Sequence, residues 1–286
     1  MIKNNPYLKE EGPLVGLVAT PIGNIEDITL RAINFLKKAD IIACEDTRNT
    51  SLLLSRLDIK PKKLVSLYAQ IELKESKRIL QEVKEKKLTL AYCSDAGMPG
   101  ISDPGALLVK TCYEENVPVT ILPGPTASLS ALVLSGIDSA DFSFYGFLPT
   151  KTSQIKSFLS SLKDRKETLI FYESPKRIVS TLNIMKEVFS ENRTVSLIRE
   201  LTKIHEEVIT GTLKELNENE MIEKGECIII VEGNKEDTSL SEEAIILLIK
   251  EKIKEGKSIS SLSKEIASEY NLSKNYIYKL GLDIKD

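Results

Sequence analysis

Apolar and polar positions occur in blocks along the first 125 residues, where short apolar runs are separated by longer amphipathic stretches. The amphipathic stretches at 30–39 and 74–86 have the period of a helix. The apolar runs are continuous, which is typical of strands that are covered on both faces. This order of elements predicts βα units around a largely parallel sheet. The predicted strands span 14–20, 39–45, 63–68, 88–94 and 118–123.

A second set of apolar runs follows Gly124 and a stretch of small residues at 126–136 that predicts a helix. These runs are closer together and several are rich in β-branched residues, so they favour a second, mixed sheet. They span 142–147, 167–173, 194–201, 206–213 and 226–233. We therefore expect an α/β protein whose parts are an N-terminal extension (1–12), two α/β domains (13–124 and 125–235) and a tail (236–286).

The tail begins with a polar stretch at 233–243, which predicts a linker, and continues with helical patterns at 240–256 and 263–282. The second pattern has helix-turn-helix spacing, with Ala267 where two helices approach closely and Asn271 at the turn. A hairpin that packs on the main body and a module that docks on nucleic acid or a protein are both compatible with this pattern. The expected apolar core of the tail is Ile266, Tyr270, Leu272, Ile277 and Leu280.

The composition narrows the class of protein. No apolar run reaches the roughly 18 to 20 residues that cross a bilayer, and the N-terminus lacks a signal peptide's apolar centre, so we expect a cytoplasmic protein without a membrane partner. The four cysteines form no CxxC pair, so we expect reduced, mostly buried thiols and no metal. His205 is the single histidine, which argues against a histidine-based dyad and favours a surface or hydrogen-bonding role.

Charge gives a local signal only. The net charge of −3 is not that of a protein that binds nucleic acid over its whole surface. The stretch from Lys151 to Arg177 carries seven basic and three acidic residues, a net charge of +4. An RNA contact and an ordinary solvated helix face explain this stretch equally well.

Four loops after predicted strands carry the candidate chemistry, because open α/β sheets bind their ligands at the strand ends. Glycine and proline in 20–24, 94–105 and 122–128 allow tight bends that expose backbone amides, and the last of these bends opens a helix that can hold a carboxylate. In the loop at 45–48, Glu45 or Asp46 can accept a proton or bind a ribose hydroxyl, and Arg48 can bind a phosphate. The alternative is an Asp46–Arg48 ion pair that caps the next helix.

Seven motifs occur in order between residues 14 and 233: TPIGNxxDIT, EDTRxT, SDAGxPxISDPG, LPGPxA, GFLPxK, FYESPxR and RELTKxxE. Together they resemble the tetrapyrrole methylase superfamily, and more closely its branch of small-subunit ribosomal RNA methyltransferases. The resemblance implies a class III methyltransferase fold, with two α/β domains and S-adenosylmethionine in the cleft between them, in a homodimer. The C-terminal helix-turn-helix resembles an extension found in the same branch.

The resemblance also implies where the donor binds. When the family's motifs are matched to this chain, the implied cofactor-binding residues come from the three glycine- and proline-rich bends and from positions on the second sheet. They are Pro21, Ser94, Asp95, Ala96, Gly97, Met98, Pro123, Gly124, Pro125, Thr126, Ala127, Phe171, Tyr172, Leu201, Cys227 and Ile228.

The chain departs from the family pattern at two places. After the third strand the family usually has His-x-x-Asn-Glu, whereas this chain has Tyr68-Ala-Gln-Ile-Glu72, which keeps only the glutamate. In the third motif Met98 replaces the usual threonine and Gly100 replaces a larger apolar residue. The first departure excludes a mechanism that needs a histidine at that place. The second leaves backbone contacts with the donor in place.

The function that the resemblance implies is 2'-O-methylation of a cytidine in the decoding region of 16S ribosomal RNA, with the small ribosomal subunit as partner. We expect Glu45 or Asp46 to assist the ribose hydroxyl and Arg48 to position the RNA. The other expected substrate-binding residues are Lys151, Lys176, Arg177 and Arg199. The alternatives are a methyltransferase of precorrin-like tetrapyrroles and a non-enzymatic RNA-binding factor in ribosome assembly.

Overall fold

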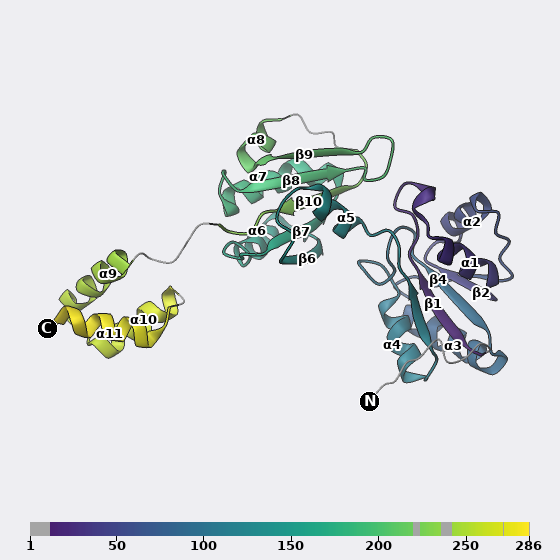
Figure 1. The fold of residues 1–286 in the computed structure, drawn as a ribbon, viewed down its shortest axis with the longest axis horizontal. Coiled ribbons are helices and arrows are strands. Elements are labelled where there is room, and N and C mark those ends of the chain that lie inside the picture. Colours follow the sequence, from purple (N-terminus) through teal and green to yellow (C-terminus); the bar gives the residue numbers. More distant parts are fainter. Residues whose placement is uncertain (1–11, 220–223, 236–241, 271, 286) are drawn as a thin grey trace. The chain divides into compact units, whose positions relative to one another are not determined.

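The computed structural model describes residues 12–219, 224–235, 242–270 and 272–285 (Figure 1). Its contacts divide the chain into two compact units, Met1–Gly233 and Asn234–Asp286. Most of the expected N-terminal extension, the centre of the expected linker and Asn271 lie outside the described residues. The predicted α/β fold is confirmed, because the first unit contains two five-stranded sheets with helices between the strands.

The first sheet contains the five strands predicted from continuous apolar runs, in the order β3-β2-β4-β1-β5. All its pairings are parallel, as expected. Its strands are β1 (Leu14–Val18), β2 (Ile41–Cys44), β3 (Leu64–Ser66), β4 (Thr89–Cys93) and β5 (Val119–Leu122). Each strand is shorter than its apolar run by two to three residues, because residues at one or both ends of the run belong to the adjoining loops.

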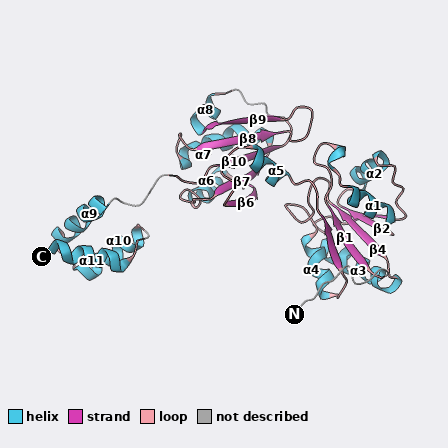
Figure 2. Ribbon diagram, viewed as in Figure 1, coloured by secondary structure: helices cyan, strands magenta, loops and turns pink. Residues whose placement is uncertain are grey.

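Helices cover both faces of this sheet (Figure 2). On one face, Leu17 and Tyr92 belong to a buried cluster with residues of α3 (Glu72–Lys86) and α4 (Ala106–Glu114). On the other face, Val18 and Ile42 pack with residues of α1 (Leu30–Lys38) and α2 (Thr47–Arg56). A short helix, η1 (Ile25–Asp27), follows the first bend. Burial on both faces explains why the strands lack polar alternation.

Gly16 lies in the centre of β1, where α1 approaches the sheet closely. A Cβ atom at this position would lie 2.4 Å from the Phe35 ring, so no larger residue fits unless the ring moves. The close approach lets the ring of Phe35 pack directly on the strand backbone.

The second sheet is mixed, as predicted, with the order β6-β7-β10-β8-β9. The pairing of β6 with β7 is parallel, and the other three pairings are antiparallel. Its strands are β6 (Phe142–Phe147), β7 (Thr168–Glu173), β8 (Thr194–Arg199), β9 (Glu207–Thr212) and β10 (Cys227–Val231). Each apolar run that was predicted to form a strand, in both sheets, therefore contains one.

The two faces of the second sheet bury different elements. One face packs on α6 (Thr152–Ser160), α7 (Ile178–Phe189) and α8 (Leu213–Glu218) in the largest buried cluster. The other face packs on α5 (Ala127–Leu134), and the same cluster contains Ile22 from the first bend and Leu201 from the loop after β8. A short helix, η2 (Pro175–Arg177), follows β7. The first bend of the first sheet thus contacts the second sheet directly.

The C-terminal unit contains α9 (Glu242–Lys254), α10 (Ile259–Glu269) and α11 (Lys274–Lys285). Its core is formed within the unit, around Ile245, Ile249 and Leu262. The predicted tail core is confirmed, since Ile266 and Ile277 are buried while Tyr270, Leu272 and Leu280 pack against them. Among the residues described, no helix is long and apolar enough to span a bilayer.

Candidate active site

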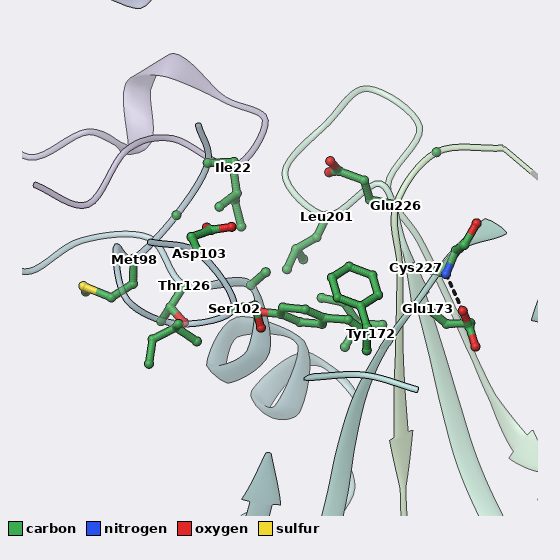
Figure 3. Close-up of a pocket in the computed structure, with 18 of the residues that line it drawn as sticks. Ile22, Met98, Ser102, Asp103, Thr126, Tyr172, Glu173, Leu201, Glu226 and Cys227 are labelled. Atoms are coloured by element: carbon green, nitrogen blue, oxygen red, sulfur yellow. Dashed lines mark hydrogen bonds between the residues drawn. The ribbon is translucent and has the colours of Figure 1, made fainter. Parts of the chain in front are cut away.

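A cavity of about 390 Å³ lies where the bends of the first sheet meet the second sheet. Figure 3 shows Ile22 and Asp103 on one side and Leu201 and Tyr172 on the other. The lining comes from the loop after β1, the loop after β4, the start of α5 and the ends of second-sheet strands. The lining residues are Ile22, Ala96, Gly97, Met98, Ile101, Ser102, Asp103, Thr126, Ala127, Phe147, Tyr172, Glu173, Ser174, Pro175, Leu201, Gly225, Glu226, Cys227 and Ile228.

Backbone hydrogen bonds join the first two bends. The Thr20 N–H donates to the Gly97 carbonyl at 2.9 Å, and the Gly97 N–H donates to the Thr20 carbonyl at 3.1 Å. The buried hydroxyl of Ser94 donates to the same Gly97 carbonyl at 3.2 Å. Gly97 has φ +79°, a conformation that favours glycine. These bonds hold the backbone of both bends at the cavity without the need for long side chains.

The far end of the loop at 94–105 is held by Glu72, the residue that this chain shares with the family after the third strand. Glu72 is 4% exposed, and its carboxylate accepts hydrogen bonds from the Gly105 N–H at 2.8 Å and the Leu108 N–H at 3.0 Å. Gly105 is the N-cap of α4 and has φ +133°. Glu72 therefore satisfies amides at the start of α4, where a helix leaves its N–H groups unpaired.

The loop at 45–48 contains the Asp46–Arg48 ion pair, which was one of the two interpretations of its sequence. Asp46 caps α2, where it accepts a hydrogen bond from the Arg48 N–H at 2.8 Å, and its Oδ2 lies 2.5 Å from Arg48 Nη2. The Arg48 guanidinium lowers the pKa of Asp46 to about 2. Asp95 binds this loop by accepting hydrogen bonds from the Asp46 N–H at 3.2 Å and Asn49 Nδ2 at 2.8 Å.

Two carboxyl groups next to this network behave differently from Asp46. Burial, with Glu45 and Asp95 nearby, raises the pKa of Asp103 to about 6. Burial, with Asp95 and Asp46 nearby, also raises the pKa of Glu45. The cavity lining contains no lysine or arginine, and the described residues offer Asp103 no ion-pair partner. This side of the cavity thus presents an uncompensated carboxylate, which favours a cationic ligand.

Nine of the predicted cofactor-binding residues line the cavity: Ala96, Gly97, Met98, Thr126, Ala127, Tyr172, Leu201, Cys227 and Ile228. Phe171 does not, because successive side chains of a strand point to opposite faces and its ring lies in the core with α6 and α7. Asp95 and Ser94 also lie outside the lining, where Asp95 binds the loop at 45–48 and Ser94 binds the Gly97 carbonyl. The remaining predicted positions outside the lining are Pro21, Pro123, Gly124 and Pro125.

The residues that were missed belong mostly to motifs that the sequence had already singled out. Ile22 belongs to the first motif, and Ile101, Ser102 and Asp103 belong to the third. Phe147 belongs to GFLP, and 173–175 belongs to FYESP. The sequence signal was therefore present, but only the strand register decides which motif residues face the cavity. Gly225 and Glu226 carry no motif, and they reach the cavity because they directly precede β10.

None of the predicted catalytic and substrate-binding residues is part of the cavity lining. Glu45, Asp46 and Arg48 do not line the cavity, although Glu45 acts electrostatically on Asp103. Among the residues described, Lys151 and Lys176 are exposed and form no ion pair.

Two predicted substrate-binding arginines have partners in the fold. Arg177 Nη2 donates to the Pro149 carbonyl at 2.6 Å and to Glu173 Oε2 at 3.1 Å. Arg199 pairs with Glu207 across β8 and β9 at 3.0 Å, and its side chain is 11% exposed. Their contact with a substrate remains a prediction.

The four cysteines are buried free thiols, as predicted. In the part of the chain that the structure describes, no group of three His, Cys, Asp or Glu residues is arranged to bind a metal ion.

Comparison with the sequences of known proteins identifies the family of this chain. The sequence profile of the tetrapyrrole (corrin/porphyrin) methylases matches residues 15–217. The chain belongs to the tetrapyrrole methylase family. Ribosomal RNA small subunit methyltransferase I of Halalkalibacterium halodurans is 48% identical over 222 residues, 77% of this chain and 76% of that protein. The protein of the same name from Streptococcus pyogenes serotype M3 is 40% identical over 273 residues, 94% of each chain.

Within the tetrapyrrole methylase family, the chain is thus a member of the ribosomal RNA small subunit methyltransferase I group. The crystal structure of diphthine synthase has a TM-score of 0.59 at 14% identity, over 77% of this chain and 90% of that one, which supports the shared fold. The family profile covers both sheets except β10.

Proposed function

We propose that this protein transfers a methyl group from S-adenosylmethionine to small-subunit ribosomal RNA, at the 2'-hydroxyl of a cytidine in the decoding region of 16S RNA. The observation that carries the proposal is the cavity at which three predicted bends and the second sheet meet. The relatives named as ribosomal RNA small subunit methyltransferase I support the choice of substrate.

The cavity fits the donor by size and chemistry. Its volume of about 390 Å³ lies in the range of sites for small cofactors, roughly 300–1,000 Å³. Ile22, Leu201 and Ile228 offer apolar surface for the nucleoside part. The Asp103 carboxylate suits the donor's positive charge, and the first amides of α5 suit its carboxylate, since no side chain caps that helix.

When bound, S-adenosylmethionine supplies a methyl group on a sulfonium, which is a good leaving group. The chain then has two tasks, to hold the ribose oxygen in line with that methyl group and to accept the hydroxyl proton. Of the two predicted acceptors, Glu45 suits this role better. Its pKa is raised by burial, whereas Arg48 holds the pKa of Asp46 at about 2 and occupies its oxygens.

The proposal includes the substrate contacts and the context of the enzyme. Lys151 and Lys176 are exposed and can bind phosphate groups of the RNA. Arg48, whose side chain is 88% exposed, can reach a phosphate while it remains paired with Asp46. We also propose a homodimer in the cytoplasm, where the ribosomal substrate occurs.

The test uses the full-length protein, labelled S-adenosylmethionine and small subunits from cells that lack the gene. Calorimetry measures donor binding first, and methyl transfer with mapping of the modified ribose follows. Transfer to a cytidine 2'-oxygen supports the proposal. Transfer to a precorrin instead would make the protein a small-molecule methylase, and absence of donor binding would favour a non-enzymatic RNA-binding factor.

A further inference from the structure

Phe147 is a large aromatic side chain that remains 65% exposed although it lines the cavity. It is the last residue of β6 and follows Gly146, where the pairing of β6 with β7 is interrupted by a register shift. Gly146 has φ +66°, and a Cβ atom there would lie 3.3 Å from Ser102 Oγ in the loop after β4. The irregular strand end therefore brings the ring to the rim of the cavity next to that loop.

The ring is held in place although it is exposed. It contacts Tyr172 edge-on, with ring centroids 5.5 Å apart, and Phe144 supports the same tyrosine at 4.9 Å. The backbone beyond Phe147 is fixed by Arg177, which donates to the carbonyls of Leu148 at 3.4 Å and Pro149 at 2.6 Å.

Arg177 is itself anchored. It pairs with the buried carboxylate of Glu173, which also accepts a hydrogen bond from Thr181 Oγ1 at 2.7 Å. A preformed aromatic surface binds a ligand with little loss of conformational entropy.

The chemistry around the ring suits a nucleotide. Pro175 lines the cavity, and the next residue, Lys176, is exposed and has no ion-pair partner among the residues that the structure describes. Four residues after Phe147, Lys151 is exposed in the same way. An aromatic face beside lysines is the combination that binds unpaired nucleotides, because bases stack on rings and phosphates pair with cations.

The acidic groups at the rim oppose a phosphate inside the cavity. Asp103 lies in the lining without a cation, whereas Glu173 is paired with Arg177, and Glu226 is paired with Lys203. A phosphate is therefore directed outward, toward Lys176, while the base can lie on the ring of Phe147.

We propose that Phe147 positions the substrate of the proposed reaction by stacking on the target nucleobase, so that the attached ribose faces the cavity and its phosphate lies toward Lys176. The inference rests on the proposed function, because it assigns the base of the same RNA. It predicts that the target nucleotide is unpaired when it is bound.

The test compares Phe147→Ala with Phe142→Ala, a matched change at an exposed phenylalanine of the same strand that does not line the cavity. Loss of one stacking contact is expected to raise KM for undermethylated small subunits by roughly 5- to 150-fold. The Kd for S-adenosylmethionine should stay unchanged, Phe147→Trp should restore KM, and Phe142→Ala should behave as the wild type.

Three results would overturn the inference. A matching loss of donor affinity in Phe147→Ala would assign the ring to the donor site, and a change in sedimentation would assign it to a subunit interface. An unchanged KM would show that the ring does not touch the substrate.

Binding of small subunits in the absence of donor separates this inference from the proposed function. If the wild type binds the particle but transfers no methyl group, the proposed function is wrong, while weaker binding by Phe147→Ala still supports stacking. Equal binding by Phe147→Ala and the wild type contradicts the stacking contact whatever the reaction is.

Discussion

The buried carboxylate of Glu72 accepts a hydrogen bond of 2.8 Å from the backbone N–H of Gly105. This contact joins the first turn of α3 to the N-cap of α4, and it fixes the last residue of the loop at 94–105. The conformation of that loop places Gly97 and Asp103 in the lining. Glu72 therefore acts on the site from a distance, through the backbone of the loop.

Replacing Glu72 by Ala should lower the free energy of unfolding by about 2 kcal/mol, because two buried N–H groups lose their acceptor. Donor affinity should also fall as the loop loosens. Urea unfolding and calorimetry measure the two effects. Glu75→Ala is the control, since among the described residues the Glu75 side chain forms a single partly exposed ion pair, with Arg78, and its loss should change stability little. Equal effects of both changes would contradict the role of Glu72.

Donor binding should weaken as the pH falls below about 6, the value to which burial raises the pKa of Asp103. Protonation removes the carboxylate charge that attracts the cationic donor. Calorimetry between pH 5 and 8 measures this dependence. Asp103→Asn should bind the donor weakly at every pH, without the step near 6. A variant that keeps the wild-type pH dependence would assign the step to another group.

The same raised pKa has a consequence for stability without donor. The pKa of Asp103 is 3.8 when unfolded and about 6 when folded, so the folded state binds the proton more tightly between these values. Its contribution is therefore most favourable below about pH 4 and is lost as the pH rises through 6. Asp103→Asn should raise the urea midpoint at pH 7 and leave it nearly unchanged at pH 4. A lower midpoint at pH 7 would contradict this.

Glu45→Gln should lower kcat by roughly 100-fold or more with the donor Kd unchanged, since a general base contributes about 10²–10⁴ to the rate. Asp46→Asn is the matched change one residue away. It should release Arg48 from its ion pair while the cap of α2 and much of kcat are retained, because Asn caps a helix about as well as Asp. Single-turnover methylation of small subunits measures both. If only Asp46→Asn abolishes transfer, Asp46 is the proton acceptor.

Gly16→Ala should destabilise the first sheet by about 1–3 kcal/mol, because the new methyl group would lie 2.4 Å from the Phe35 ring. The double variant Gly16→Ala with Phe35→Leu should recover part of this loss, since a smaller side chain leaves space for the methyl group. Urea unfolding of both variants and of Phe35→Leu alone gives the coupling. Additive effects would show that the two residues do not compete for space.

The sequence by itself determined the elements and their order. Continuous apolar runs predicted the parallel strands from 14 to 123, and the more closely spaced β-branched runs predicted the mixed sheet. These predictions were possible because the local spacing of apolar residues reflects which faces of an element are buried. The bends at 20–24, 94–105 and 122–128 were also evident, since glycine and proline are needed where a chain turns tightly. All three contribute residues to one cavity.

Only the tertiary structure decided what each side chain does there. Adjacent residues of β7 face opposite ways, so Tyr172 lines the cavity and Phe171 lies in the core. Asp46 became a helix cap paired with Arg48, and Asp103 became the unpaired carboxylate of the cavity. The position of Tyr172 depends on strand register, and the state of Asp103 depends on which residues from distant parts of the chain surround it. The Asp46–Arg48 pair is local, and the structure decided only between the two interpretations that the sequence had left open. A local pattern fixes which residues are buried, but it does not fix which distant residue each one meets.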